Sequence, residues 1–464
     1  MKPVIVLVGR PNVGKSTLFN RLTRGRDALV ADSPGLTRDR QYGEGRRGDK
    51  PYLLIDTGGV VEDLEKANRT QATMAAVTRE QTRQAIDEAD AIIFLVDARS
   101  GATPADEELA QYLRRMEKPV TIAVNKAEGM DSATVTADFH RLGLGNMCAI
   151  SAKRGDGIDN LLQGLLSEFS AEEDSIVDDD IPRVAVVGRP NVGKSTLINS
   201  MLGEERVVVF DEPGTTRDSI RIPLERQGRS YILIDTAGVR RKRRVHETIE
   251  KFSVIKTLQA IEEANVVILM LDADQGLSEQ DASLAGYILE KGRSLVIAVN
   301  KCDKVDQQRR SWIERELERR FAFIAFVRPH FISALYGNAI GALFKSTDRA
   351  FASACKNMGT SQLNRALEKA VLATQPPMVK GRRIKLKFAH QGGRNPPLIV
   401  IHGNQLDRLP DSYRRYLANA FRKAFKLEGT PVKIECRVSL NPYSGKIRRK
   451  SARYRGKPSR RPGR

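Results

Sequence analysis

One segment of this sequence occurs twice. Residues 8–20 read VGRPNVGKSTLFN, and residues 187–199 read VGRPNVGKSTLIN. Two shorter segments, PGLTRD at 34–39 and LIDTGGV at 54–60, return at the same spacing of 179 as PGTTRD and LIDTAGV. VDA then matches LDA, and AVNK matches a second AVNK, at a spacing of 175. Because the segments recur in the same order, the sequence predicts two related domains in tandem.

Within each copy, apolar runs alternate with polar stretches of helical periodicity. AIIFLVDA at 91–98 and VVILMLDA at 266–273 are examples. Continuous apolar runs of this length are typical of parallel strands buried between helices. We therefore expect an α/β protein in which each repeat forms a mostly parallel sheet with flanking helices.

The pattern changes beyond about residue 358. Helical segments at 361–371 and 412–425 are interleaved with strand-like segments at 382–390, 397–403 and 431–438. The order α-β-β-α-β predicts a small α+β domain, in which helices back a sheet. The side chains expected to face inward are Leu363, Ala366, Leu367, Ala370, Val371, Tyr413, Leu417, Ala420, Phe421, Ala424, Val432, Ile434, Cys436 and Val438.

These patterns divide the chain into five predicted parts. We expect a first repeat domain at 1–168, an acidic linker at 169–181, a second repeat domain at 182–355, a third domain at 356–443 and a basic tail at 444–464. The join around the linker reads SEFSAEEDSIVDDDIP and lacks periodicity. A solvated spacer is its simpler interpretation. An acidic strap that competes for a basic surface is the alternative.

Composition narrows the class of protein. The four cysteines are scattered without a CxxC pair or Cys/His cluster, which argues against zinc or disulfides and favours a reducing cytoplasm. No run approaches the ~20 apolar residues that a membrane helix needs. The net charge of +20 favours a polyanionic partner, and residues 445–464 hold ten Lys/Arg and no acid. We expect a soluble, cytoplasmic monomer without a membrane partner.

The repeated GRPNVGKST segment predicts phosphate binding. It contains the full G-x-x-x-x-G-K-[ST] pattern of a P-loop, and each copy follows an apolar strand, as the motif requires. The backbone N–H groups of such a loop surround phosphates at a helix N-terminus. Lys15 and Lys194 would reach the β- and γ-phosphates, and Ser16 and Ser195 would hold Mg²⁺.

Two further positions complete the predicted Mg²⁺ site in each copy. Asp56 and Asp235 end a strand and would act from the outer shell of the metal. Thr37 and Thr216 follow Pro-Gly at matched positions and would close over Mg²⁺ and the γ-phosphate. Their loops should order with triphosphate and relax after hydrolysis. A simple turn threonine is the alternative.

The Asn-Lys loops predict guanine as the base. Asn125 and Asn300 would support the purine and the phosphate loop, while the stem of the following lysine lies along the base. A carboxylate would then accept hydrogen bonds from guanine, and adenine presents the wrong donors. Asp303 has the usual form, whereas Glu128 places its carboxylate about one bond further out. We predict a weaker or less selective first site, which Glu128→Asp would tighten.

Over nearly its whole length the chain resembles the bacterial tandem GTPase family EngA, also called Der. The two repeats, the acidic join and the segments PPMVKGRRIKLKFAH, NPPLIVIHGN, LPDSYRRYL, GTPVKIE and NPY carry the resemblance. It implies a GTP-hydrolysing factor in assembly of the large (50S) ribosomal subunit, with rRNA as a partner and a KH-like third domain. This chain has no G-x-x-G between adjacent helices of that domain, so its direct contact with RNA stays open.

The resemblance also bears on hydrolysis. Where GTPases of the Ras kind carry a water-orienting glutamine, this chain has Val60 and Val239. In related GTPases the asparagine of GRPN helps to bind K⁺, and Asn12 and Asn191 match that position. We predict slow intrinsic hydrolysis that K⁺ stimulates in both domains. An asparagine that serves only hydrogen bonds of the loop is the alternative.

Each predicted site thus has a defined set of residues. Those expected to bind GTP or GDP in the first repeat are Gly9, Arg10, Pro11, Asn12, Val13, Gly14, Lys15, Ser16, Thr17, Asp56, Thr57, Gly58, Gly59, Asn125, Lys126, Glu128, Ser151 and Ala152. Those in the second are Gly188, Arg189, Pro190, Asn191, Val192, Gly193, Lys194, Ser195, Thr196, Asp235, Thr236, Ala237, Gly238, Asn300, Lys301, Asp303, Ser333 and Ala334. The catalytic set is Asn12, Lys15, Thr37, Asn191, Lys194 and Thr216.

Two basic segments predict contact with RNA. Five consecutive basic residues at 240–244 follow DTAG in the second repeat, where the first repeat has the acidic VVEDLEKAN. We therefore expect the second domain to switch RNA binding. The tail should bind phosphates with little sequence preference. For residues 240–244 the alternative is a solvated basic face, and for the tail it is a solubilising segment.

For the function as a whole, the alternative is an RNA-binding scaffold in which the nucleotide is mainly structural. A membrane-remodelling GTPase is disfavoured because the sequence shows no membrane element.

Overall fold

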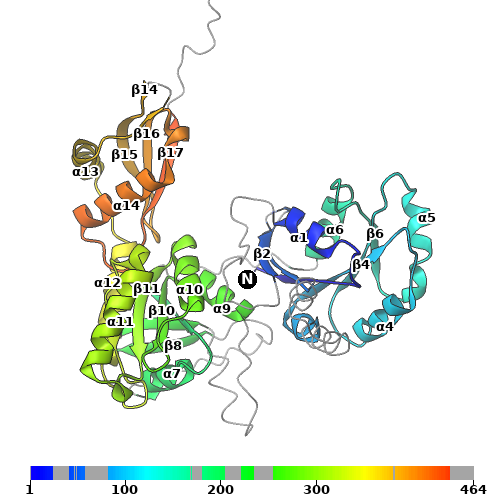
Figure 1. The fold of residues 1–464 in the computed structure, drawn as a ribbon, viewed down its shortest axis with the longest axis horizontal. Helices are drawn as coiled ribbons and strands as arrows, with labels where there is room; N and C mark the ends of the chain where they lie inside the picture. The colour runs from blue at the N-terminus through cyan, green and yellow to red at the C-terminus, as the bar shows by residue number, and fades with distance from the viewer. Residues whose placement is uncertain are drawn as a thin grey trace, which may run out of the picture. The chain divides into compact units, whose positions relative to one another are not determined.

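The computed structural model describes residues 2–23, 41–45, 47–48, 50–57, 82–167, 169, 180–203, 221–234, 254–379 and 382–438 (Figure 1). Helices and strands carry the labels of Figure 1, including the gaps in their numbering. The chain divides into two compact units, Met1–Ala354 with Leu427–Pro431, and Cys355–Lys426 with Val432–Arg464. The predicted basic tail and residues 240–244 lie outside the described residues, as does most of the acidic linker. The predicted domain boundaries therefore stay predictions.

The first repeat forms a six-stranded sheet in the order β2-β3-β1-β4-β5-β6. Its strands are β1 (Val4–Val8), β2 (Gln41–Gly45), β3 (Tyr52–Asp56), β4 (Ala91–Asp97), β5 (Val120–Asn125) and β6 (Asn146–Ala149). Its helices are α1 (Lys15–Leu22), α4 (Pro104–Leu113), α5 (Ser132–Ala137), η1 (His140–Leu142) and α6 (Ile158–Leu166). All pairings are parallel except that of β2 with β3.

The second repeat has the same strand order, β8-β9-β7-β10-β11-β12. Its strands are β7 (Arg183–Gly188), β8 (Ile222–Arg226), β9 (Arg229–Ile234), β10 (Val266–Asp272), β11 (Ser294–Asn300) and β12 (Pro329–Phe331). Its helices are α7 (Lys194–Gly203), α9 (Val254–Glu263), α10 (Glu279–Glu290), η2 (Cys302–Lys304), α11 (Gln307–Arg320), η3 (Ala322–Ile324) and α12 (Ile340–Ala354). Only β8 is antiparallel to its neighbour. The predicted tandem of α/β domains is confirmed.

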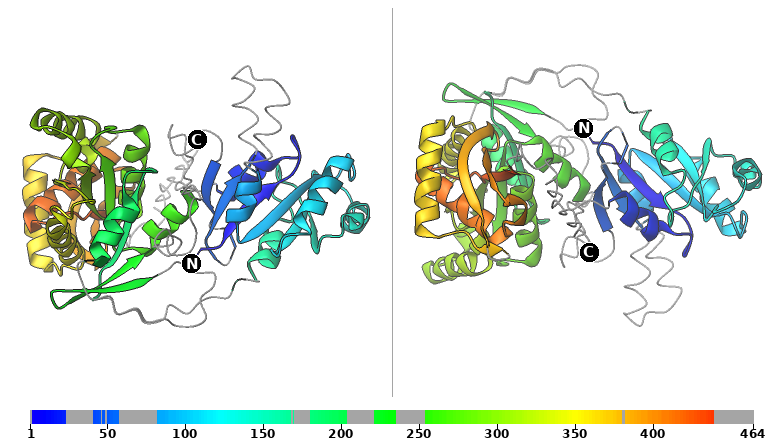
Figure 2. Two further views of the ribbon diagram at one scale, coloured as in Figure 1. Left: turned by 90° about the horizontal axis from the view of Figure 1, so that it is seen from below. Right: turned by 90° about the horizontal axis from the view of Figure 1, so that it is seen from above.

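Helices cover both faces of each sheet, which explains the continuous apolar strands. In the first repeat, α1 and α6 pack on one face and α4 on the other (Figure 1). In the second, α7 and α12 lie opposite α9, α10 and α11, and Figure 2 shows the layers from two further directions. The strands β1, β4 and β10 are buried along their whole length. Removing this apolar surface from water is the main stabilising contribution.

Polar residues end several of these buried strands. Asp56, Asp97 and Asn125 end β3, β4 and β5, and Asp272 and Asn300 end β10 and β11. All five are buried. Burial of a polar side chain is costly unless it is hydrogen-bonded. In parallel sheets these carboxyl ends meet at one edge, which is where ligands bind in α/β folds.

The C-terminal unit has the predicted order of helix, strand, strand, helix and strand. Its sheet, β15-β16-β17, pairs β15 antiparallel and β17 parallel to the central strand, beside two helices (Figure 1). A short pair, β13 with β14, adds to this plan. The elements are α13 (Thr360–Ala373), β13 (Met378–Val379), β14 (Arg382–Arg383), β15 (Lys385–Gly393), β16 (Leu398–Asn404), η4 (Leu406–Arg408), α14 (Asp411–Phe425) and β17 (Lys433–Val438).

Most of the side chains predicted to face inward in this unit are buried or half-buried, with two exceptions. Ala424 is exposed, and the following Phe425 is buried instead. The buried stripe of α14 advances in steps of four from Tyr413, so the larger apolar side chain at 425 takes the inner position. Val438 is 49% exposed because it is the last residue of β17. No helix among the described residues is long and apolar enough to cross a membrane.

Candidate guanine-nucleotide sites

Each P-loop connects the central strand of its sheet to the following helix. β1 leads into α1, and β7 leads into α7. The backbone is left-handed at Asn12 and Gly14, with φ of 63° and 100°, and at Asn191 and Gly193, with φ of 60° and 102°. A Cβ at Gly14 would lie 2.4 Å from Asn125 Nδ2, and glycine therefore permits the close approach of loop and base-side asparagine. Gly193 stands in the same relation to Asn300.

The P-loop lysines are held by carbonyl groups of their own loops. Lys15 Nζ donates to the carbonyls of Gly9 and Arg10, both at 2.9 Å. Lys194 Nζ donates to Gly188 and Arg189, at 3.1 and 2.9 Å. Burial lowers the pKa of Lys15, although Asp56 opposes that shift. Each lysine is thus placed at the loop that would surround the phosphates.

The predicted metal ligands of the first site lie together. Ser16 Oγ, at the start of α1, donates to Asp56 Oδ2 at 2.7 Å. Hydroxyl and carboxylate oxygens are the ligands that Mg²⁺ prefers, so the residues present fit this ion. Ser195 takes the same place at the start of α7. Its predicted partner Asp235 lies outside the described residues.

The asparagines of the Asn-Lys loops join the phosphate side of each site to the base side. Asn125 Nδ2 donates to the Val13 carbonyl at 2.7 Å, and its Oδ1 accepts from the Ala152 amide at 2.8 Å. Asn300 repeats both contacts, with the Val192 carbonyl at 2.8 Å and the Ala334 amide at 2.9 Å. These bonds satisfy buried groups in the P-loop and in the base-side loop, which holds Ser151 and Ala152 in the first repeat and Ser333 and Ala334 in the second. The two loops are therefore fixed relative to each other.

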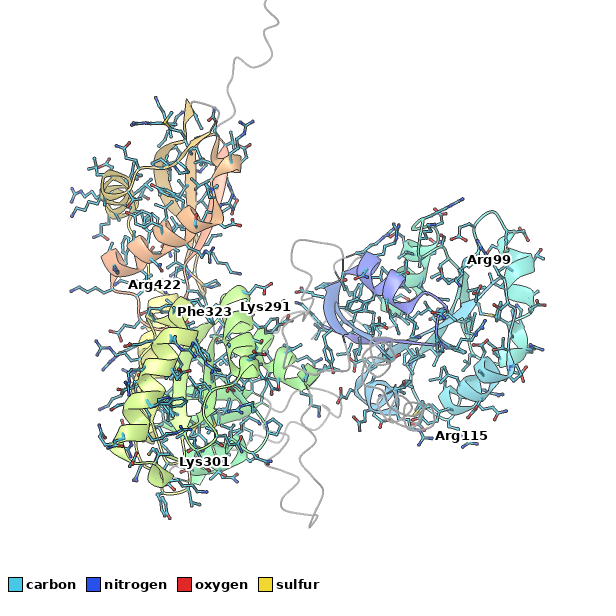
Figure 3. All side chains as sticks on the ribbon, in the orientation of Figure 1. Arg99, Arg115, Lys291, Lys301, Phe323 and Arg422 are labelled. Carbon is cyan, nitrogen blue, oxygen red and sulfur yellow. The ribbon has the colours of Figure 1, made fainter. Side chains whose placement is uncertain are left out.

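The lysines of the Asn-Lys loops form ion pairs with two aspartates, Asp97 and Asp272, that the sequence analysis did not identify as site residues. Lys126 Nζ donates to Asp97 Oδ2 at 2.7 Å, and Lys301 Nζ donates to Asp272 Oδ2 at 2.6 Å. Lys301 is labelled in Figure 3. Burial opposes ionisation of Asp97, but hydrogen bonds from Lys126 and from the Arg99 amide outweigh it and lower the pKa. Both aspartates belong to the repeated VDA and LDA segments. Their role becomes evident only from the pairing of β4 with β5, which places Asp97 opposite Asn125.

The base-reading carboxylates meet equivalent serines. Ser151 Oγ donates to Glu128 Oε1 at 2.7 Å, and Ser333 Oγ donates to Asp303 Oδ1 at 2.5 Å. These bonds lower the pKa of both carboxyl groups, so both are ionised near neutral pH. The other oxygen of Glu128 lies 3.4 Å from Arg99, which is also labelled in Figure 3. The longer acid thus keeps the serine contact and gains a cationic neighbour.

The arginine of each GRPN segment links the P-loop to the helix that follows the neighbouring strand. This helix is α4 after β4 in the first repeat and α10 after β10 in the second. Arg189 donates to Asp281 Oδ1 at 3.1 Å and to the Gly276 carbonyl at 2.6 Å. Arg10 approaches Asp106 Oδ2 at 3.4 Å. Asp106 and Asp281 complete capping boxes at the starts of α4 and α10. The sequence reasoning did not identify these two aspartates as supports of the site.

The remaining predicted residues divide into three groups. Val13 and Val192 are buried under their loops, and Thr57 Oγ1 donates to the Leu7 carbonyl at 2.8 Å. The P-loop positions Pro11, Thr17, Pro190 and Thr196 complete the loop-to-helix turns. The predictions on Thr37, Gly58, Gly59, Val60, Thr216, Asp235, Thr236, Ala237, Gly238 and Val239 lie outside the described residues.

Comparison with known proteins assigns this pair of sites to a family. Residues 4–126 and 183–301 match the family described as 50S ribosome-binding GTPase. Residues 357–437 match the family described as KH-domain-like of EngA bacterial GTPase enzymes, C-terminal. GTPase Der of Azoarcus sp. (strain BH72) is 57% identical, over 96% of this chain and 100% of its own length. GTPase Der of Halorhodospira halophila (strain DSM 244 / SL1) is 56% identical, over 98% of this chain and 96% of its own.

The chain belongs to the GTPase Der family. As a Der-family GTPase it binds guanine nucleotides and hydrolyses GTP, and its third domain is KH-like. The predicted family and fold are thereby confirmed, whereas the roles of single residues stay predictions. Among solved structures, Era in complex with MgGDPNP and nucleotides 1506-1542 of 16S ribosomal RNA covers 56% of this chain and 92% of its own. At 22% identity and a TM-score of 0.28, that similarity supports no argument about this Der-family chain.

Proposed function

We propose that this Der-family GTPase is a cytoplasmic, monomeric factor in assembly of the large (50S) ribosomal subunit, and that its nucleotide state controls its binding to ribosome and rRNA. The observation that carries the proposal is the duplicated asparagine clamp, in which Asn125 and Asn300 each join a P-loop to a base-side loop. Two such sites in one chain with a KH-like domain fit a switch better than a single structural nucleotide. The family description, 50S ribosome-binding GTPase, supports the ribosome as the partner.

The residues of each site have separate roles in this proposal. Lys15 and Lys194 place positive charge at the β- and γ-phosphates. Ser16 with Asp56, and Ser195 with the predicted Asp235, would hold Mg²⁺. Mg²⁺ held by these residues would supply positive charge that neutralises negative charge developing on the phosphates. The predicted threonines Thr37 and Thr216 would close over the nucleotide and would release RNA-binding surface after hydrolysis.

Hydrolysis is proposed to be slow and stimulated by K⁺. Asn12 and Asn191 are exposed on loops with a left-handed backbone, which leaves their side chains accessible to a cation beside the phosphates. We expect GTP hydrolysis to be faster in K⁺ than in Na⁺, and we expect Asn12→Ala with Asn191→Ala to remove the difference. Asn146→Ala, at an exposed position of β6, is the control. Equal rates of the wild-type chain in the two salts would overturn this part.

Co-sedimentation with ribosomal subunits tests the function itself. The full chain and the variants Lys15→Ala and Lys194→Ala are compared with a non-hydrolysable GTP analogue and with GDP. Lys345→Ala, an exposed lysine on α12, is the matched control. We expect the wild-type chain to sediment with 50S subunits only with the GTP analogue, and we expect each P-loop variant to weaken that response.

The outcomes separate a switch from a scaffold. Because the basic residues 240–244 belong to the second repeat, Lys194→Ala should reduce association more than Lys15→Ala. Association that is equal with GTP analogue, with GDP and without nucleotide would identify an RNA-binding scaffold instead. Association of the wild-type chain with 30S subunits alone would exclude the proposed partner.

A further inference from the structure

The three-stranded sheet of the C-terminal unit has one buried face and one open face. Ala389, Ile399 and Ile401 are fully buried on the first face, which α13 and α14 back. Phe388, the neighbour of Ala389 in β15, is 44% exposed. Neighbouring residues of a strand point to opposite faces, so Phe388 belongs to the open face. A large apolar ring at such a position needs an explanation other than core packing.

The strand register gathers further rings and cations on the open face. Phe388 pairs with His402, and His402 pairs with Arg437 across β17. Two pairs further along, and thus on the same face, His390 lies opposite Val400. A bulge between Leu386 and Phe388 shifts the register, so Lys385, opposite Asn404, also falls on this face. The open sheet face thus comprises Lys385, Phe388, His390, Leu398, Val400, His402, Asn404, Lys433, Glu435 and Arg437, and of these the central Val400 is itself buried, at 1% exposure.

Three rings on this face form a continuous stack. The ring centroids of Phe388 and His402 are 4.5 Å apart, with an angle of 8° between the planes. His390 extends the stack, with its centroid 5.1 Å from that of His402 and a plane angle of 24°. Near-parallel rings at these distances make stacked contacts with one another. Because Phe388 remains 44% exposed, a further planar group can cover it.

Cationic side chains surround the stack. Lys385, Lys433 and Arg437 are all exposed. The acidic residue on the face, Glu435, accepts from Arg437 Nε at 2.7 Å. The face therefore combines flat rings with an excess of positive charge at its border. A basic groove with stacking side chains is the combination by which proteins bind single-stranded nucleic acid without reading its sequence.

We propose that this open sheet face binds unpaired bases of single-stranded RNA. A base stacks on the exposed ring of Phe388, which His402 supports from within the stack, and Lys385 and Lys433 contact the flanking phosphates. The inference rests on the proposed RNA partner of the chain and assigns that contact to a surface. It also gives the KH-like domain a means of contact that does not use a G-x-x-G loop, which its sequence lacks.

The test uses the full chain with a non-hydrolysable GTP analogue and a short single-stranded RNA that carries 2-aminopurine, a base whose fluorescence falls when it stacks. Titrations at ~0.3 M KCl reduce binding that depends on phosphate charge alone, including binding by the basic tail. We expect Phe388→Ala to weaken binding about tenfold and to abolish the fluorescence change, as expected for one lost stacking contact. Phe388→Trp should preserve both signals.

A second exposed phenylalanine provides a matched control. Phe323 is 46% exposed in the second repeat and is labelled in Figure 3. Phe323→Ala should leave RNA affinity unchanged, and thermal unfolding should show that both variants remain folded. An abasic ribose-phosphate chain of equal length should bind the wild-type chain about as weakly as the intact RNA binds Phe388→Ala.

The outcomes also separate this inference from the proposed function. Equal affinity of wild-type chain and Phe388→Ala for the RNA, or equal binding of the abasic chain, would overturn the stacking surface while leaving the RNA partner in place. An absence of RNA binding by the wild-type chain would overturn both. If Phe388→Ala instead weakens association with ribosomal proteins while RNA affinity is unchanged, the face binds protein and the proposal is wrong.

Discussion

The two nucleotide sites of this chain share a frame and differ at the carboxylate that reads the base. Both sites have the same asparagine clamp and the same lysine-aspartate ion pair, with distances that agree within about 0.1 Å. In the first site Glu128 contacts Ser151 and Arg99, and in the second site Asp303 contacts Ser333. At the position that matches Arg99, the second repeat has Asp274. The longer acid and the arginine therefore occur together.

This difference shows how a nucleotide site can accommodate a longer acid and keep the same contact to its serine. The extra methylene of Glu128 does not prevent its carboxylate from reaching the serine that the matching Asp303 reaches. Arg99 lies beside the other oxygen and favours the extended side chain. The carboxylate, the serine and the arginine would then act as one unit in the first site. The strength of that site stays a prediction, which the following experiments address.

The largest effect is expected from removal of an asparagine clamp. Asn125→Ala leaves the Val13 carbonyl and the Ala152 amide without their buried partner. Each unsatisfied group costs about 1–3 kcal/mol, so we expect GTP affinity at that site to fall about a hundredfold. Asn300→Ala should cause an equal loss at the second site. Titration with a fluorescent GTP analogue measures each site in a chain whose other P-loop lysine is replaced by alanine.

The outcome of these two variants decides whether the sites share a frame. Asn146→Ala, an exposed asparagine of β6, should change neither affinity. Losses that differ by more than about tenfold between Asn125→Ala and Asn300→Ala, or about 1.4 kcal/mol, would show that the similar geometry hides different energetics.

A carboxylate exchange should have the next largest effect. Asp303→Glu introduces the longer acid into a repeat that has Asp274 at the position matching Arg99, so we expect charge repulsion where the first site has an ion pair. A misplaced charge-assisted hydrogen bond costs roughly 1.5–3 kcal/mol, so GTP affinity at the second site should fall about ten- to a hundredfold. Adding Asp274→Arg should restore part of the loss. Glu128→Asp, made in parallel, should tighten the first site.

The added Asp274→Arg substitution distinguishes the effect of the cation from that of the loop. If Asp303→Glu binds GTP as tightly as the wild-type chain, the glutamate needs no cationic neighbour, and the pairing of Glu128 with Arg99 is incidental. If the loss occurs but Asp274→Arg leaves it unchanged, the loop itself rather than the cation adapts the first site. Affinity for ATP, measured with the same variants, reports whether base selectivity follows affinity.

The lysine-aspartate pairs should contribute about a tenfold effect. Asp272→Asn keeps the size of the side chain but removes the charge that holds Lys301. Within the part of the chain that the structure describes, Asp272 is the acceptor of the Lys301 ammonium group. Asp97→Asn should cost less, because Lys126 also donates to the Asn12 carbonyl at 2.9 Å. A charged hydrogen bond is worth about 1.5–3 kcal/mol, part of which water recovers at this half-buried lysine. Titration of GTP at each site measures both losses.

An equal effect at the two sites would contradict the role of the Asn12 contact. Because these aspartates position a lysine rather than touch the nucleotide, the loss should appear in affinity for both GTP and GDP. A variant that loses GTP affinity alone would instead place the aspartate near the γ-phosphate side of the site.

The sequence predicted the frame of both sites but not their supports. Repetition with constant spacing identified the P-loops and the Asn-Lys loops, because those segments are contiguous in the chain. Asp97 and Asp106 act across neighbouring strands and helices, and their partners become evident only when β1, β4 and β5 are placed side by side. Local patterns do not contain that information.

The same limit explains the open sheet face of the third domain. Alternation along β15 would place Lys385 and Phe388 on opposite faces, since they are three residues apart. The bulge before Phe388 reverses that expectation and places the lysine on the same face as the ring. A bulge is set by the pairing of two strands and has no strong signal in either one. Ala424 is a smaller case, in which the size of Phe425 decided the inner position of α14.

Replacement of Arg99 should have the smallest effect and is the most specific test of the difference between the sites. Arg99 is 64% exposed, and its contact with Glu128 is 3.4 Å long. Exposed ion pairs contribute up to about 1 kcal/mol, so Arg99→Ala should weaken GTP binding at the first site no more than about fivefold. Because salt screens exposed charges, the effect should shrink as KCl is raised. Arg115→Ala, an exposed arginine of the same repeat, is the control, and both residues are labelled in Figure 3. A loss that persists at high salt would mean that Arg99 acts through packing of the loop rather than through its charge, and the two sites would then differ in shape as well as in electrostatics.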